Sequence, residues 1–126
     1  KDIKKISGGT VAKIIQKITE IIASMPPEEQ NSAALNFSAL FSVLGKSFDN
    51  KLGQTMQTLA PNPVVVATIK NILEGTKGGQ VFDKLIEPHL DSNQKAEINK
   101  VSKEDLENYR KEKIQEQKKQ TALYLS

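Results

Sequence analysis

The sequence contains one histidine, His89, and no cysteine. Histidine is the usual general base near neutral pH. Because His89 is the only histidine, a catalytic triad of serine, histidine and aspartate would have to contain it. His89 lies between Pro88 and Leu90, and no nucleophile motif accompanies it. We therefore expect a surface histidine beside a turn and not a catalytic one. The absence of cysteine also excludes disulfides, thiolate nucleophiles and zinc-cysteine sites.

The segment Asp91, Ser92 and Asn93 is rich in the oxygen ligands that calcium binds. A calcium loop also needs ligands at alternating positions, a central glycine and an acid at the twelfth position. Counted from Asp91, the twelfth residue is Ser102. A helix cap explains the segment more simply, and we expect no metal site.

Two pairs of adjacent acids, Glu28 with Glu29 and Glu104 with Asp105, have the carboxylates that acid-base catalysis uses. Each pair falls at the start of an expected helix, where acids complement the helix dipole and stay hydrated. The glycine-rich segment 75–79 lacks the spacing of a Walker loop and follows a helix instead of a strand. We therefore expect neither an enzyme nor a cofactor.

Composition favours one helical domain. The chain has 126 residues, 37% of them apolar and 5% aromatic, so the core must be aliphatic. The net charge of +3 is modest, and Arg110 is the only arginine, which argues against a nucleic-acid-binding face. No apolar run approaches the ~20 residues that cross a bilayer. Nothing in the sequence assigns a compartment.

Apolar residues at helical spacing predict a first helix over residues 10–25, capped by Thr10 and ended by Pro26 and Pro27. Its apolar face consists of Val11, Ile14, Ile15, Ile18, Ile21, Ile22 and Met25. We interpret this helix as the central strut of the bundle. Residues 1–9, which include two glycines before the cap, are predicted to be a flexible basic N-terminal arm.

Residues 10–101 are predicted to form the helical core of the domain. Beyond the first helix we expect helices at 27–44, 47–59, 63–74, 80–87 and 92–101. The helix over 27–44 has few charges and a wide apolar face, so it is the candidate for the buried central helix. The predicted fold is all-α, a single-domain bundle of five to six helices with a long, polar C-terminal helix.

The C-terminal helix, residues 102–126, is highly charged and begins with a capping box formed by Ser102 and Asp105. Its apolar stripe is too thin to anchor the whole helix, which either packs on the bundle or projects from it. The leading hypothesis is a non-enzymatic protein interaction or assembly domain that binds another protein or a second copy through this helix. The predicted partner-binding residues are Leu106, Tyr109, Ile114, Leu123, Tyr124 and Leu125. Deleting residues 108–126 is then expected to leave the bundle folded.

Two alternatives involve an apolar ligand or a membrane. A helical bundle with small residues between its helices can carry a fatty acid or another apolar molecule, although an ordinary close-packed core fits the same pattern. The predicted lining of such a cavity is Ile18, Ile22, Phe37, Leu40, Phe41, Ile69, Leu73 and Phe82. The helix over 10–25 could instead lie on a membrane surface with its lysines outward. We do not favour this, because the other helices need that apolar face.

Overall fold

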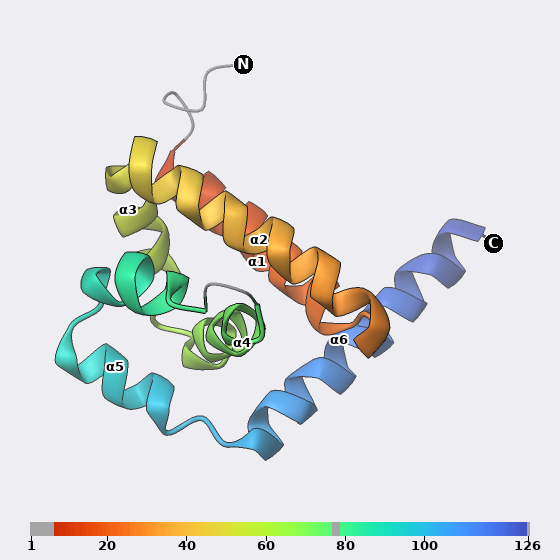
Figure 1. Cartoon of the computed structure of the whole chain (residues 1–126). Helices are drawn as coiled ribbons and strands as arrows, with labels where there is room; N and C mark the ends of the chain where they lie inside the picture. Colours follow the sequence, from red (N-terminus) through yellow and green to blue (C-terminus); the bar gives the residue numbers. More distant parts are fainter. Residues whose placement is uncertain (1–6, 77–78, 126) are drawn as a thin grey trace.

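The computed structural model describes residues 7–76 and 79–125, in which every regular element is a helix (Figure 1). This confirms the prediction of an all-α, single-domain bundle. The elements are α1 (Gly8–Ala23), α2 (Pro27–Ser47), α3 (Asp49–Leu59), α4 (Pro63–Glu74), a π-helical segment (Phe82–Ile86), a 3-10 turn (Glu87–His89), α5 (Ser92–Asn99) and α6 (Lys103–Leu125).

The first helix begins earlier than predicted. The side chain of Ser7 accepts a hydrogen bond from the backbone N–H of Thr10 at 3.1 Å, so Ser7 is the cap and Gly8 and Gly9 form the first turn. The prediction of Thr10 as cap was wrong, because a serine three residues upstream offers the same hydroxyl. The rest of the predicted arm, residues 1–6, lies outside the described residues.

Proline and glycine positions predicted other helix ends correctly. Pro27 is the first residue of α2 and Pro63 the first residue of α4, as expected of a residue with no backbone N–H to leave unpaired. Gly75 caps the end of α4. The capping box of Ser102 and Asp105 is confirmed by hydrogen bonds of 3.0 and 3.1 Å.

Helix α4 lies at the centre of the bundle. It contacts α1, α2, α3, α5, α6 and the π-helical segment, and Figure 1 looks nearly along its axis. Its buried residues are Val65, Val66, Ala67, Thr68, Ile69 and Leu73. The helix predicted to be central, α2, instead leaves Leu35 and Val43 about half exposed, so that prediction was wrong. The small number of charged residues in the sequence of α2 suggested a buried helix. It reflects instead an outer surface of α2 that is exposed but uncharged.

The 3-10 turn is fastened to α3 by His89. Its Nε2 lies 3.0 Å from Oδ1 of Asp49, and its ring packs against Gly53, where a Cβ would come within 3.1 Å of Nδ1. The side chain is 22% exposed. His89 thus lies beside a turn, as predicted, but it is mostly covered and joins two elements of the fold.

Candidate functional site

The first half of α6 belongs to the bundle. Helix α6 contacts both α1 and α4, and Tyr109 is 7% exposed in the hydrophobic core. Leu106 is partly buried and packs against the same core. Two of the six predicted partner-binding residues therefore already contact the bundle.

An ion pair fastens the next turn of α6 to α1. The Nζ of Lys113 lies 3.7 Å from a carboxylate oxygen of Glu20, and the two side chains are 12% and 13% exposed. The same Nζ is 3.1 Å from Glu116 and 5.2 Å from the centre of the Tyr109 ring. Burial alone lowers the pKa of Lys113, but the hydrogen bond to Glu116 and the charges of Glu20, Glu116 and Glu112 raise it above its ordinary value.

The hydroxyl of Tyr109 is buried beside this ion pair. Among the described residues it has no hydrogen-bond partner. Burial raises the pKa of Tyr109 well above 10.0, and the negative charges of Glu20, Glu112 and Glu116 raise it further. Tyr109 therefore keeps its proton in the folded chain, and its hydroxyl is an uncompensated polar group in the core.

The packed part of α6 ends where α1 turns into α2. There, Ile114, Gln117 and Lys118 of α6 line a shallow groove with Ile21 and Met25. From Lys118 to Leu125 every side chain is exposed. Figure 1 shows this end of α6 extending past the turn between α1 and α2. We call residues 118–125 the α6 tip.

The α6 tip ends in Leu123, Tyr124 and Leu125, which are 76%, 89% and 78% exposed. Tyr124 follows Arg110 and Gln117 at intervals of seven residues, or about two helical turns, so the three residues lie on the same side of α6. In the first half of α6 this side faces the bundle. Because the bundle has ended, the same side of the helix meets solvent at Tyr124.

The structure thus divides the six predicted partner-binding residues into three groups. Leu106 and Tyr109 pack in the bundle, Ile114 borders the groove at the last contact with α1, and Leu123, Tyr124 and Leu125 lie together on the α6 tip. Sequence reasoning missed Ile21, which is 40% exposed and lines the same groove as Ile114. The only available signal was its apolar character, since its position opposite α6 depends on the tertiary packing.

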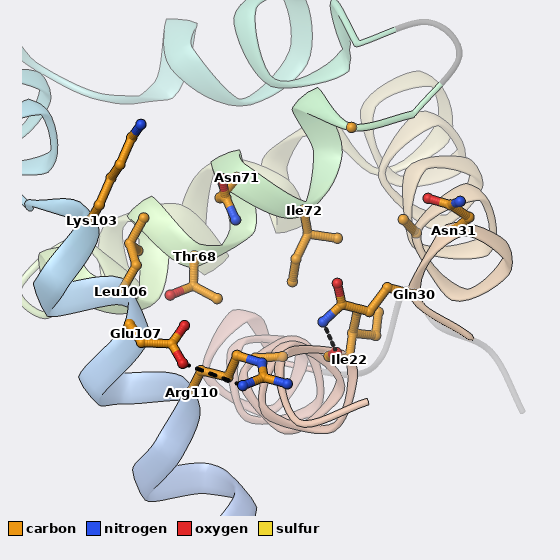
Figure 2. Close-up of a pocket in the computed structure, with 13 residues that line it drawn as sticks. Ile22, Gln30, Asn31, Thr68, Asn71, Ile72, Lys103, Leu106, Glu107 and Arg110 are labelled. Atoms are coloured by element: carbon orange, nitrogen blue, oxygen red, sulfur yellow. Dashed lines mark hydrogen bonds and ion pairs between the residues drawn. The ribbon is translucent and has the colours of Figure 1, made fainter. Parts of the chain in front are cut away.

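A second hollow, of about 350 Å³, lies among α1, α2, α4 and α6 (Figure 2). Apolar side chains, including Ile22, Ile72 and Leu106, line part of it. The remaining lining is polar and includes Gln30, Asn31, Thr68, Asn71, Lys103, Glu107 and Arg110. Arg110 is paired with Glu107 at 3.3 Å, and Gln30 donates to the carbonyl oxygen of Ile22 at 3.1 Å.

Of the eight residues predicted to line an apolar cavity, Ile22 lines this hollow and the other seven do not. Five of those seven are at most 2% exposed in the core, namely Phe37, Phe41, Ile69, Leu73 and Phe82. Ile18 and Leu40 pack against the same core. The carrier hypothesis stays a prediction, and the hollow in Figure 2 is more polar than the cavity it expects.

In the described part of the chain no cluster of three or more histidine, cysteine or acidic side chains could hold a metal ion. No helix within residues 7–76 and 79–125 is both long and apolar enough to cross a membrane. Comparison with known proteins found no matching family model, no matching curated protein and no matching solved structure.

Proposed function

We propose that this domain is a non-enzymatic interaction domain that binds another protein through the α6 tip. The observation that supports this most strongly is the exposure of three adjacent large apolar side chains, with Tyr124 at 89%. Single exposed apolar residues are common on protein surfaces, but a cluster at the end of a projecting helix is typical of a binding element.

Burial of the tip would stabilise a complex substantially. Full burial of an aromatic or leucine side chain contributes roughly 1.5 to 3 kcal/mol, so the three side chains together supply roughly 5 to 9 kcal/mol. Association itself costs about 4 to 15 kcal/mol, so the complex we propose also needs further contacts beside these three side chains. The tip is already helical, which lowers the ordering cost of binding.

The charges of the tip define the chemistry of the partner. Residues 118–125 contain Lys118 and Lys119 and no acid. The partner we propose therefore offers an apolar groove for the end of α6, with acidic side chains where the two lysines approach.

Neither alternative is favoured by a specific observation. For membrane binding, α1 exposes Ile14 and Ile21 at 47% and 40%, but Val11, Ile15 and Ile22 of the same helix are buried in the core. For a carrier, most of the predicted lining is packed inside the bundle, as described above. Both remain predictions.

The proposal is tested with a triple variant, Leu123→Ser, Tyr124→Ser and Leu125→Ser, in the full chain. We expect it to fold with unchanged stability and to lose the partner that the unmodified chain captures from cell extract. The control changes three exposed residues of the packed half of α6, Asn108, Lys111 and Gln115, to serine, and should retain the partner. Equal capture by both variants would exclude the α6 tip as the binding element.

A further inference from the structure

The outer face of α2 is uncharged over a long stretch. From Gln30 to Gly45 the sequence contains no charged residue. Several of these residues nevertheless face solvent, including Ser32, Ala39, and the half-exposed Leu35 and Val43, at 48% and 54%. An exposed helix surface usually carries charges, as α6 does, so the outer face of α2 differs from an ordinary solvated helix.

This uncharged region has one charge at each end. Glu28, Ser32, Leu35, Ala39, Val43 and Lys46 follow one another at intervals of four, three, four, four and three residues, which places them on one side of the helix. All six are exposed. Neither Glu28 nor Lys46 forms an ion pair with another residue in the described part of the chain.

We propose that this face binds the same face of a second copy of the chain, with the two α2 helices antiparallel. Glu28 and Lys46 each lie nine residues from position 37, on opposite sides of it. Consider a two-fold axis that crosses the outer face of α2 at the level of position 37, perpendicular to the helix. It places Glu28 of one copy opposite Lys46 of the other, at both ends of the contact.

The apolar middle of the face fits the same register. Leu35 and Ala39 each lie two residues from position 37, so each leucine meets the alanine of the other copy. A large side chain opposite a small one lets two helices approach closely. A parallel pairing would instead bring Glu28 against Glu28 and Lys46 against Lys46. The order of charges thus favours an antiparallel second copy.

This pairing uses no residue of the α6 tip, so the dimer and the proposed function can be tested independently of each other. A dimer formed through α2 would carry two α6 tips. If both engaged one partner assembly, the second binding event would be intramolecular and the apparent affinity would rise.

The test is sedimentation equilibrium of the full chain over a range of concentrations, with the variants Glu28→Lys and Lys46→Glu. Each single reversal places like charges together at both ends, and we expect each to weaken dimerisation about tenfold. The double variant restores both pairs and should dimerise within about twofold of the unmodified chain. The control Glu29→Lys makes the same charge change in the same helical turn, one residue off the face, and should have little effect.

A cross-linking experiment tests the register. Because the chain has no cysteine, Leu35→Cys and Ala39→Cys each introduce a single thiol. A mixture of the two variants treated with a short bis-maleimide should give mainly the mixed product, in which the thiol at position 35 of one copy is joined to the thiol at position 39 of the other. Predominant joining of two thiols at position 35 would contradict the antiparallel register.

Three results would overturn the proposal. These are a chain that stays monomeric at every concentration tested, a double charge variant that fails to recover dimerisation, and equal effects of Glu28→Lys and Glu29→Lys. Binding of the unmodified chain to lipid vesicles with loss of that binding on Leu35→Ser, without dimerisation, would assign the face to a membrane instead. The triple serine variant of the α6 tip should dimerise normally, which separates this outcome from failure of the proposed function.

Discussion

The ammonium group of Lys113 on α6 lies 3.7 Å from the carboxylate of Glu20 on α1, with both side chains largely covered. Glu20 also lies 4.0 Å from Lys17 and accepts a hydrogen bond from Gln16 at 3.3 Å. Lys113 is thus the point at which the polar helix α6 is fastened to the first helix. One turn farther on, α6 reaches its last contacts with α1 and the exposed tip begins.

Replacement of Lys113 by methionine is expected to destabilise the domain. The variant removes the cation that Glu20, Glu112 and Glu116 share, and Glu20 keeps the more exposed Lys17 at 4.0 Å. We expect the free energy of unfolding to fall by about 1 to 3 kcal/mol, between the values for an exposed pair and a buried one. Denaturant unfolding measures this. Lys111→Met, at an exposed position of the same helix, is the control, and an equal loss there would contradict the special role of Lys113.

Replacement of Tyr109 by phenylalanine is expected to stabilise the domain. The variant keeps the aromatic ring and its contact with Lys113. It removes a buried hydroxyl that has no hydrogen-bond partner among the residues the structure describes. Leaving such a group unpaired costs about 1 to 3 kcal/mol, so the midpoint of thermal unfolding should rise. A fall in stability would show that the hydroxyl makes a hydrogen bond in solution.

The stability of the domain should decrease at alkaline pH. The pKa of Tyr109 is raised above 10.0 in the fold, so the unfolded chain releases this proton first. Stability is therefore unaffected by this group below about pH 10 and falls as the pH rises toward the folded pKa. The raised pKa of Lys113 acts in the same direction. Denaturant unfolding curves measured from pH 8 to pH 11 should show a smaller decrease in the free energy of unfolding for Tyr109→Phe than for the unmodified chain. An identical decrease in both would show that Tyr109 does not cause the loss of stability.

Replacement of Gly53 by alanine should destabilise the domain although Gly53 lies inside α3. Alanine is favoured over glycine in a helix interior by about 1 kcal/mol. Here, however, its Cβ would lie 3.1 Å from Nδ1 of His89, whose ring is held by Asp49. The same change in a His89→Ala background should be stabilising. A double-mutant cycle measures the difference, and identical effects in both backgrounds would show that the ring moves aside freely.

Much of the fold was predictable because local chemistry decides it. Pro27, Pro63 and Gly75 mark helix ends through properties of their own backbones. Ser7 was missed because two glycines separate it from the apolar pattern. The ranking of α2 above α4 as central helix failed because both have wide apolar faces, and only the packing of all helices determines which one is surrounded.

The candidate site was predictable only in part. The apolar residues Leu123, Tyr124 and Leu125 stood out in a polar helix, and they are exposed. The division of α6 into a packed half and a tip was not predictable, because it depends on Lys113 meeting Glu20, which lies far earlier in the chain. A charged residue in a highly charged segment gives no sign that its partner lies in another helix. The predicted deletion of residues 108–126 would remove Tyr109 and Lys113 as well, so residue 118 is the better boundary.

Photo-cross-linking from the α6 tip tests the proposed function at the residue that supports it. A photoreactive phenylalanine analogue is placed at position 124 in one sample and, as a control, at the exposed position 111 in the other. The proposal predicts that position 124 becomes joined to one partner protein, at an apolar segment flanked by acids, and that position 111 does not. Equal labelling from both positions, or no labelled protein from position 124, would contradict it.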